Sequence, residues 1–545
     1  MTTATNITAN PRVPDPVNVE TLDYAPGSPE ATRLLRVIET VRGQTRSLPH
    51  VINGARLETP ETTRVVAPHE HGLTLGHLAT ARAQDVQAAI DASLAARHDW
   101  SRTPWWERAA IFLRASELIN GRFRDELLAT TMLGQSKTFH QAEIDINELI
   151  DFLRYNVKLA SQIFDTQPFS VTGVLNVMDH RPLEGFVLAL TPFNFTAIAG
   201  NLPATATLMG NVVVWKPSEK SALSSQVVMR VFEEAGLPPG VINLVHGDGH
   251  LVSTTAQAHE LLAGISFTGS TAVFRNLWRT TAANLDVYRS YPRLVGETGG
   301  KNAVIAHPTA DPEALLVALV RGAFEYQGQK CSAASRAYLP RSLWRDLEGP
   351  LVETTAGLRV GDVADHQTFL GAVISEASAQ RLRGAIDMVK GDGAHEILVG
   401  GTISTERGWF VDPTIVRTDD PSSFTMSEEL FGPFLSVYVY EDSDWERTLD
   451  LVDGTSQYAL TCSIFASDRR AITTALDKLR DTAGMTYVND KPTGATMGQQ
   501  SFGGGRASGT NDKTGSVLAL YRWLSGRFIK ESMAPALDWT YPYMG

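Results

Sequence analysis

Apolar residues recur at helical spacing between Arg82 and Phe164. The runs AQDVQAAIDASLAARHDW, ERAAIFLRASELIN and AEIDINELIDFLRYNV place apolar side chains three and four positions apart, which is the spacing of one helix face. We therefore expect three helices in this region. The next stretch, FSVTGVLNVMDHRPLEG, alternates apolar and polar residues around Gly173 and predicts a β-hairpin that projects from the body.

From Phe186 onward, strand-like apolar runs alternate with helical ones. GFVLAL, VVVWKP, VINLVHG and GISFTG predict strands, whereas SSQVVMRVFEEAG and STAVFRNLWRTT predict helices. The alternation restarts after LVGETGGKN with KNAVIAH, EALLVALVRGAFEYQ and SRAYLP, and it continues to TYVND near Asp490. Such alternation predicts the α/β class, with two doubly wound parallel-sheet domains.

The segment from Gly185 to Trp215 contains no charged residue and is long enough to span a membrane. Pro192 and Pro203, together with three asparagines, interrupt it. These interruptions favour a buried strand, a turn, a short helix and a second buried strand, because strands covered on both faces have continuous apolar runs. We therefore expect no membrane partner.

Composition limits the remaining possibilities. A chain of 545 residues exceeds one hydrophobic core, so we expect two or three domains. The net charge of −12 argues against a nucleic-acid partner. Two cysteines cannot form a disulfide framework and fit a reducing compartment. The first 20 residues have no apolar signal region and few arginines, which predicts a loose polar arm on a cytoplasmic protein.

The two cysteines have different surroundings. Cys331 stands in GQKCSAASR, next to Lys330. A catalytic cysteine needs a lowered pKa or a nearby base. Taken alone, the tripeptide KCS favours a buried structural cysteine. Cys462 lies in the apolar run YALTCSIFA, which indicates core packing. The 13 histidines are scattered and none pairs with a cysteine at ligand spacing, so we expect no metal site.

Five other stretches decide between these interpretations of Cys331. They are TPFNF, VVVWKPSE, FTGST, GETGGKN and EELFGP. In this order, and together with the cysteine, they resemble the aldehyde dehydrogenase superfamily. Each stretch alone is modest evidence, whereas the set in register extends over more than 200 residues.

The resemblance implies a catalytic set of three residues. Cys331 attacks an aldehyde carbonyl, and the side-chain amide of Asn194 and the Cys331 backbone N–H stabilise the oxyanion. Glu297 activates the water that hydrolyses the thioester, which a carboxyl does best when burial raises its pKa. The alternative for Glu297 is a solvated turn residue, and the alternative for Asn194 is an ordinary turn asparagine after Pro192.

The resemblance also implies an NAD site without the Gly-x-Gly-x-x-Gly fingerprint, which the chain lacks. Ser270 in FTGST begins a helix whose N-terminus favours the pyrophosphate. Glu219 accepts from a ribose 2′-OH and repels a 2′-phosphate, which favours NAD over NADP. Phe431 packs near the nicotinamide ribose, although core packing is the commoner role of a phenylalanine. The implied cofactor-binding residues are Thr191, Lys216, Ser218, Glu219, Gly269, Ser270, Thr271, Glu429 and Phe431.

Longer stretches narrow the resemblance to the Δ1-pyrroline-5-carboxylate dehydrogenase family, also called L-glutamate γ-semialdehyde dehydrogenases. They are SYPRLVGETGGKN, TPFNFTAIAGNLP, GQKCSA, the run VNDKPTGATMGQQSFGGGRASGTNDKTGS and the tail DWTYPYMG. The match extends from about His50 to the C-terminus. It implies NAD-dependent oxidation of L-glutamate γ-semialdehyde to L-glutamate, the second step of proline degradation.

Such a substrate needs a recess for its α-carboxylate and ammonium groups. The resemblance implies that backbone N–H groups of the loop 493–495 bind the carboxylate with help from Ser332. Many members have a serine where this chain has Ala495, which removes one hydroxyl donor. The full set of implied substrate-binding residues is Ser332, Gly494, Ala495, the aromatic clamp Phe195 and Phe502, and the charged Lys330 and Glu148 at the entrance. For Glu148, a solvated helix face is an equal alternative.

The predicted domains follow from the pattern and the resemblance together. They are an N-terminal arm (1–40), an NAD-binding domain (41–165 and 185–295), a catalytic domain (296–496) and an oligomerisation element (166–184 and 497–545). A lone projecting hairpin is marginal in water, which makes a homodimer, or an assembly of dimers, the expected form.

Three rival functions remain open. A CoA-acylating aldehyde dehydrogenase ends the thioester with a thiol and does not need Glu297. A non-catalytic relative would lack Cys331, Glu297 or Asn194, and all three are present. A dehydrogenase of another ω-semialdehyde would act on a substrate without the α-amino acid head, so the loop 493–495 distinguishes it.

Overall fold

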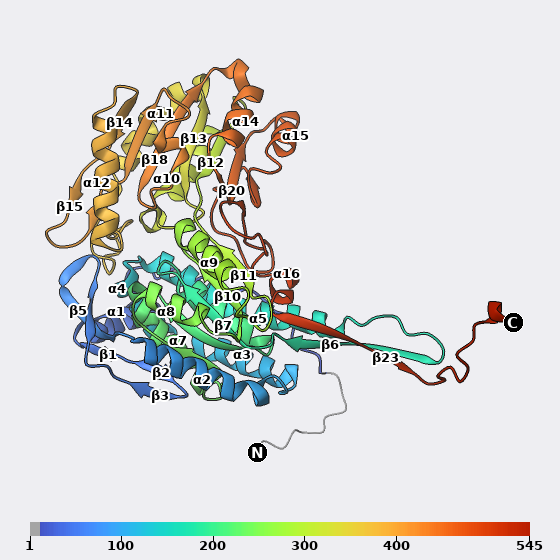
Figure 1. Cartoon of the computed structure of the whole chain (residues 1–545). Helices are drawn as coiled ribbons and strands as arrows, with labels where there is room; N and C mark the ends of the chain where they lie inside the picture. Colours follow the sequence, from blue (N-terminus) through green and yellow to red (C-terminus); the bar gives the residue numbers. More distant parts are fainter. Residues whose placement is uncertain (1–10) are drawn as a thin grey trace.

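The computed structural model describes residues 11–545, which form two α/β lobes and a projecting two-stranded ribbon (Figure 1). The first lobe has a seven-stranded sheet in the order β11-β10-β7-β8-β9-β2-β3. Its strands are β2 (His50–Ile52), β3 (Ala55–Leu57), β7 (Phe186–Thr191), β8 (Val212–Pro217), β9 (Ile242–Leu244), β10 (Leu262–Thr268) and β11 (Arg293–Glu297). A three-stranded sheet of β1 (Arg46–Leu48), β5 (Glu70–Ala79) and β4 (Thr62–Ala67) belongs to the same lobe.

The second lobe has its own seven-stranded sheet, in the order β14-β17-β18-β13-β12-β20-β21. Within it only β14 and β17 pair antiparallel among the described residues. The α/β fold class is therefore confirmed. The strands are β12 (Asn302–Ala306), β13 (Ala334–Pro340), β14 (His395–Val399), β17 (Thr414–Thr418), β18 (Phe434–Tyr440), β20 (Thr461–Phe465) and β21 (Met485–Val488).

Helices cover both sheets and explain the continuous apolar strands. Every residue of β7 is buried, and it pairs in parallel with β8 and β10. The helices of the first lobe are α1 (Pro29–Arg42), α2 (Ala83–Trp100), α3 (Trp105–Asn120), α4 (Arg124–Gln135), α5 (Phe139–Asp165), α6 (Thr196–Leu208), α7 (Ala222–Glu234), α8 (Gly249–Gln257) and α9 (Thr271–Ala283). The later helices are α10 (Pro312–Phe324), α11 (Arg341–Ala356), α12 (Glu376–Lys390), α13 (Phe424–Ser427), α14 (Trp445–Gly454), α15 (Arg469–Lys478) and α16 (Val517–Tyr521).

The charge-free segment 185–215 forms β7, α6 and β8. None of the helices within residues 11–545 combines the length and apolar character that a membrane crossing requires.

The region expected to hold three helices holds four. The missed helix is α4, whose residues from Leu127 to Gln135 are all buried. A helix covered on every side has no apolar stripe, so periodicity does not reveal it.

The N-terminal arm is not loose over its described part. Ala31, Leu34, Ile38 and Val41 are buried along one face of α1, which packs on α4. This helical spacing is present in PEATRLLRVIETVR, and the polar composition of the preceding residues concealed it. The first ten residues of the predicted arm lie outside the described residues.

The prediction of a β-hairpin is right about a strand in this segment but wrong about the strand with which it pairs. The strand β6 (Val174–Pro182) pairs along its whole length with β23 (Leu524–Ser532), in antiparallel register from Leu524↔Pro182 to Ser532↔Val174. Local pairing in this segment is the single bridge Val171↔Val174. Figure 1 shows β6 and β23 extending together away from both lobes. Alternation identified a strand, but it carries no information about a partner so distant in sequence.

Cys462 lies in the core of the second lobe, as expected. Side chains of β12 alternate between two hydrophobic clusters, with Val304 in one and Ala303 and Ile305 in the other. Cys462 on the neighbouring β20 belongs to the cluster of Ile305 and is fully buried. Its thiol therefore contributes to packing.

Candidate active site

The candidate catalytic residues meet where the two lobes face each other. β7 leads into the turn that holds Asn194, β10 leads into Ser270, and β11 ends at Glu297. Ligands bind at this carboxyl edge of open α/β sheets. Cys331 comes from the other lobe, on the loop before β13.

Two cavities share Cys331. The larger has a volume of about 870 Å³ and the smaller about 290 Å³, and Cys331 and Thr268 line both. Asn194 lines the larger cavity and Glu297 the smaller. The thiol is therefore accessible from two separate ligand spaces.

The loop before Cys331 has a strained backbone. Tyr326 and Gln327 have φ values of 51° and 56°, which non-glycine residues rarely adopt. A Cβ on Gly328 would lie 2.2 Å from the Gly432 carbonyl oxygen, so only glycine fits there.

Two glutamine side chains hold this conformation. The Gln327 amide donates to the carbonyl oxygens of Ser136 (2.9 Å) and Ala372 (2.8 Å). The Gln329 side-chain carbonyl accepts from the Ile374 N–H at 2.9 Å. These bonds explain why a Gly-Gln pair precedes the cysteine.

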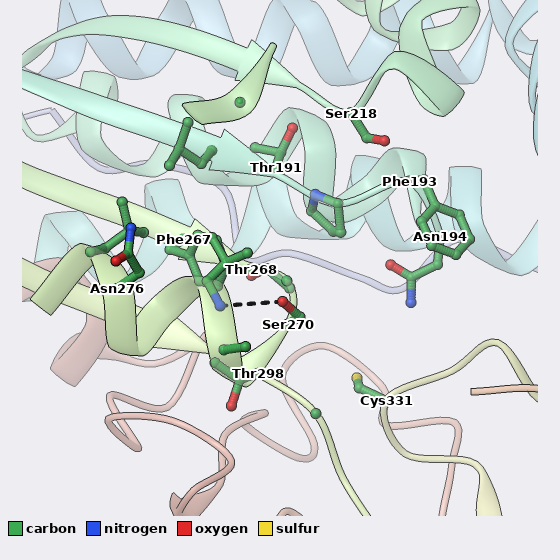
Figure 2. Close-up of a pocket in the computed structure, with 18 of the residues that line it drawn as sticks. Thr191, Phe193, Asn194, Ser218, Phe267, Thr268, Ser270, Asn276, Thr298 and Cys331 are labelled. Atoms are coloured by element: carbon green, nitrogen blue, oxygen red, sulfur yellow. Dashed lines mark hydrogen bonds between the residues drawn. The ribbon is translucent and has the colours of Figure 1, made fainter. Parts of the chain in front are cut away.

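Asn194 is held close to the loop. It is 4% exposed, and its Nδ2 donates to the Gln329 backbone carbonyl at 3.1 Å. Figure 2 shows the amide pointing toward the side of the cavity where Cys331 lies. The next residues begin α6, whose Thr196 and Ala197 N–H groups donate to the Asp145 carboxylate. Asn194 does lie in the turn after Pro192, but it is buried there and its side-chain amide is bonded to the cysteine loop.

Glu297 is a buried carboxyl and not a solvated turn residue. It is 8% exposed, and its Oε2 accepts from the Gly504 N–H at 3.2 Å. Burial raises the pKa of Glu297 well above its ordinary value. A proton acceptor with such a pKa is suited to work near neutral pH.

Three carboxyl groups lie near the thiol. Burial, followed by the carboxyls of Glu429, Glu297 and Glu148, raises the pKa of Cys331. Burial also raises the pKa of Glu429 to about 7 and that of Glu148 to about 8. Lys330, the neighbour of Cys331 in sequence, does not counter this rise in the thiol pKa, because its Nζ pairs with Glu325 at 2.8 Å. The resting residue is therefore a thiol.

Most of the candidate cofactor residues line the larger cavity. They are Thr191, Lys216, Ser218, Gly269, Ser270, Glu429 and Phe431. Glu219 and Thr271 do not line it: Glu219 begins the short 3-10 helix Glu219–Ser221, and the Thr271 hydroxyl donates to the Ala507 carbonyl. Asp248 and His250 at the start of α8 do line it. Sequence reasoning missed them, although VHGDGH places a capping aspartate before a helix.

Glycines shape the wall of this cavity. Ser270 is the N-cap of α9, and its Oγ accepts from the Val273 N–H, drawn as the dashed line in Figure 2. A Cβ on Gly269 would lie 2.7 Å from the Phe267 ring. A Cβ on Gly299 would lie 2.1 Å from the Glu429 carboxylate, whose Oε1 accepts from the Gly300 N–H at 2.8 Å. The cavity thus combines a helix N-terminus with close backbone approach, which suits a phosphate-containing ligand.

All candidate substrate residues line the smaller cavity. They are Ser332, Gly494, Ala495, Phe195, Phe502, Lys330 and Glu148. The Ser332 and Thr493 hydroxyls lie 2.8 Å apart, which ties the loop 493–495 to the cysteine loop. Glu148 is half-buried and faces this cavity, so the alternative of a solvated helix face is wrong.

The smaller cavity has further walls that sequence reasoning missed. Asn18, Val19 and Thr21 come from the N-terminal arm, and Asp151 comes from α5. No local pattern identifies them, because they are brought to the cavity by contacts between distant segments. Within residues 11–545 no three His, Cys, Asp or Glu side chains cluster in a way that could hold a metal ion.

Comparison with known proteins identifies the family. The model of the aldehyde dehydrogenase family matches residues 56–525. The mitochondrial Delta-1-pyrroline-5-carboxylate dehydrogenase of Dictyostelium discoideum is 45% identical over 540 residues, which cover 98% of this chain and 97% of that protein. The Bos taurus protein of the same name is 46% identical over 529 residues, with 97% and 94% coverage.

Solved structures agree with these relatives. The crystal structure of the Delta-pyrroline-5-carboxylate dehydrogenase from Mycobacterium tuberculosis bound with NAD has a TM-score of 0.96 and 51% identity, and the match covers 99% of this chain and 100% of that one. A mutant of the Thermus thermophilus 1-pyrroline-5-carboxylate dehydrogenase has a TM-score of 0.89 and 30% identity, with 95% and 99% coverage.

The surroundings of the two cysteines predict different reactivity toward iodoacetamide. Cys331 is open to both cavities and Cys462 is fully buried, so we expect label on Cys331 and none on Cys462. The thiolate is the reactive form, so the raised pKa shifts half-maximal labelling above the ordinary cysteine pKa of about 8.5. Glu429→Gln removes one carboxylate and shifts that midpoint to lower pH.

Peptide mass spectrometry after timed alkylation measures both effects. The variant Cys462→Ala serves as the matched control and should take up label as the unchanged protein does. Equal labelling of the two cysteines, or a midpoint below the ordinary value, would contradict the geometry described for this site.

Proposed function

The chain belongs to the aldehyde dehydrogenase family, and from that premise we propose that it oxidises L-glutamate γ-semialdehyde to L-glutamate with NAD as the hydride acceptor. The semialdehyde forms from Δ1-pyrroline-5-carboxylate, and the reaction is the second step of proline degradation. The observation that carries the proposal is the position of Cys331 between two cavities of different chemistry. The relatives of matching length named for this reaction support it.

The larger cavity fits NAD. Its volume, the N-terminus of α9 and the glycines at 269 and 299 suit a long ligand with a pyrophosphate. A neighbour with 51% identity has a crystal structure bound with NAD. Bound there, NAD supplies the acceptor for the hydride that leaves the aldehyde carbon. Lys216, Ser270 and Glu429 are the polar side chains that would hold it.

Two carboxylates near Lys216, those of Glu219 and Asp248, favour NAD over NADP. Glu219 does not line the cavity, but its charge acts on Lys216 together with that of Asp248. Asp248 does line the cavity. Two carboxylates near Lys216 therefore oppose the added charge of a 2′-phosphate.

The smaller cavity fits an amino acid with an aldehyde tail. Gly494 has a φ of +97°, which only glycine adopts readily, and both Gly494 and Ala495 line the cavity, where their backbone N–H groups would bind the carboxylate. Phe195 and Phe502 supply apolar surface for the methylene groups. The charged Lys330, Glu148 and Lys491 stand around the same space. Ala495 contributes its backbone only.

The residues then divide the chemistry among them. The Cys331 sulfur adds to the aldehyde carbon while its S–H proton passes to the former carbonyl oxygen, which gives a thiohemiacetal. That oxygen would accept hydrogen bonds from the Asn194 amide and the Cys331 N–H, and it loses its proton to water as the hydride leaves the carbon. After oxidation the acyl group remains on Cys331 as a thioester. Glu297 takes a proton from water, the water oxygen adds to the acyl carbon, and the carbon–sulfur bond breaks to release glutamate.

The state of Glu297 predicts a pH dependence. Glu297 acts as a base only when deprotonated, and burial raises its pKa. Steady-state kcat should therefore fall as pH decreases through an apparent pKa above the ordinary glutamate value of about 4.3. Glu297→Gln should lower steady-state kcat by about 10²- to 10⁴-fold while leaving an initial burst of NADH, measured by stopped-flow absorbance. Loss of the burst together with turnover would remove the general-base assignment.

The substrate assignment predicts strong selectivity. Purified protein is supplied with pyrroline-5-carboxylate in equilibrium with glutamate semialdehyde, with succinic semialdehyde, or with propanal, each with NAD and with NADP. NADH absorbance should give a kcat/KM for the first substrate at least about 10²-fold above the others, because polar recesses reject analogues that lack the matching groups.

Two controls sharpen this assay. Cys331→Ala should abolish NADH formation, and Cys462→Ala should preserve it. Added coenzyme A should leave glutamate as the product, because Glu297 directs hydrolysis. A higher kcat/KM for another aldehyde would contradict the substrate assignment. An acyl-CoA product would favour a CoA-acylating aldehyde dehydrogenase.

We propose further that the protein is a homodimer or an assembly of dimers. The ribbon of β6 and β23 and the tail beyond it expose large apolar side chains, among them Phe528 (69%), Leu537 (99%) and Trp539 (80%). Exposed apolar surface of this kind marks an interface, and a second copy of the ribbon is the occupant we infer.

Light-scattering measurement of molar mass tests this assembly. The unchanged protein should have at least twice the mass of one chain, and the double variant Phe528→Asp, Trp539→Asp should shift to a single chain. Met388→Asp, at an exposed apolar position on α12, is the matched control and should not shift. A monomeric unchanged protein would refute the proposal.

We also propose a cytoplasmic location. Both cysteines are free, and a reactive thiol at Cys331 persists best in a reducing compartment, which supports this location. Two relatives carry the word mitochondrial in their names, so the location has to be measured directly. Immunodetection in fractionated source cells should find the protein in the cytosolic fraction, and recovery in an organelle fraction would contradict this.

A further inference from the structure

Residues 18–24, which we call the strap, run along α5 without forming a helix or strand. The Val19 N–H donates to Asp151 Oδ1 at 3.0 Å, and the Leu22 N–H donates to Glu143 Oε1 at 2.9 Å. Tyr24 is 2% exposed and stacks on Phe139 at the start of the same helix, with 6.2 Å between ring centroids. The strap is thus fixed at Phe139, Glu143 and Asp151 to the helix that also carries Glu148.

The side chain of Asn18 joins three segments of the chain. Its Nδ2 donates to Asp151 Oδ2 and to the Met497 carbonyl oxygen, each at 2.9 Å. Its Oδ1 accepts from the Tyr155 hydroxyl at 3.1 Å. Every hydrogen-bonding group of the amide except one lone pair is therefore used, and the partners lie on α5 and on the loop beyond Ala495.

That loop lies directly against the junction. Gly498 has a φ of +81°, and a Cβ there would lie 2.1 Å from the Tyr155 ring. At the other end of the loop, the Thr493 and Ser332 hydroxyls lie 2.8 Å apart. The loop 494–497 is therefore attached at both ends, through the Thr493 and Ser332 hydroxyls at one end and through Asn18 at Met497 at the other.

The strap is also part of the cavity wall. Asn18, Val19 and Thr21 line the same cavity as Glu148 and residues 494–497. Because residue 495 is alanine, this loop offers a substrate carboxylate its backbone N–H groups and no side-chain hydroxyl at that position. The directions of those N–H groups depend on where the loop backbone is held.

We propose that Asn18 is a positioning residue for substrate recognition, which holds the loop 494–497 so that the N–H groups of Gly494 and Ala495 meet the α-carboxylate of an amino-acid substrate, whereas the Thr496 N–H donates to Gln500 Oε1 at 3.0 Å. The strap closes the cavity around the amino-acid head and takes no part in the chemistry at Cys331. This inference rests on the proposed function, since it concerns the head of that substrate.

Other contacts keep the strap attached when Asn18 is changed. The Leu22 and Tyr24 contacts do not involve the Asn18 side chain, and neither does the bond from the Val19 N–H to Asp151. Asn18→Ala is therefore expected to remain folded, which differential scanning fluorimetry checks. Asp15→Ala is the matched control, because Asp15 belongs to the same arm and does not line the cavity.

Steady-state kinetics of the full-length protein test the proposal. Asn18→Ala should raise KM for pyrroline-5-carboxylate about tenfold, with kcat and the KM for NAD changed less than about twofold. The kcat/KM for propanal, which has no amino-acid head, should stay within about twofold. Tyr155→Phe removes one of the three bonds and should raise KM about threefold. Asp15→Ala should change none of these values.

A binding measurement separates recognition from catalysis. L-glutamate has the same head, so its affinity measured by isothermal titration calorimetry should weaken in Asn18→Ala by the same factor as KM rises. An unchanged KM and glutamate affinity, or an equal loss with propanal, would overturn the proposal. If Asn18→Ala lost its fold, an unchanged KM in Tyr155→Phe would overturn it instead.

The proposed function and this inference fail in different ways. If the unchanged protein did not oxidise pyrroline-5-carboxylate, the function itself would fall. If the unchanged protein oxidised it and the Asn18 variant kept its affinity, only the positioning role would fall.

Discussion

The site depends on one geometric constraint, which is that a single thiol must be open to two cavities while its loop, between α10 and β13 of the second lobe, packs against the first lobe. Cys331 belongs to the second lobe, the wall of the larger cavity comes largely from the first lobe, and the wall of the smaller cavity combines first-lobe residues with residues that follow β11 in the chain. The loop meets this constraint with two consecutive non-glycine residues at positive φ. Hydrogen bonds from Gln327 to Ser136 and Ala372 stabilise this conformation, and they tie the loop to both lobes.

Charge around the thiol follows from the same constraint. Glu297 at the end of β11, Glu148 on α5 and Glu429 before β18 are brought near one sulfur, and burial raises the pKa of each carboxyl. A buried carboxyl is costly to ionise because it loses its hydration. The site therefore rests with a neutral thiol and with carboxyls whose pKa values are closer to neutrality, which is a suitable starting point for a reaction that moves protons at each stage. Gly299 makes this possible, because any side chain there would displace the Glu429 carboxylate.

Sequence reasoning was most successful where chemistry lies in short contiguous runs. Buried strands such as β7 appear as apolar runs, and the turns after them carry Asn194 and Ser270, so both the sheets and much of the site could be predicted. It failed for α4, which is buried all round, and for the partner of β6, which lies at the other end of the chain. Glu219 illustrates a third limit, since a motif gives the order of residues but not which of them faces a cavity. The strap was missed because no motif includes it. Asn18 is recognisable only through its contacts with residues 151, 155 and 497, which are distant in sequence.

The most direct test of the account is to find the acyl group on the cysteine. The Glu297→Gln variant is mixed with pyrroline-5-carboxylate and NAD, quenched in acid after one turnover and digested for peptide mass spectrometry. The account predicts one glutamyl group on the peptide that contains Cys331, only when both the substrate and NAD are present, and none on the peptide of Cys462. NADH formation without that adduct, or an adduct on another residue, would contradict the central claim that Cys331 carries the substrate between the two cavities.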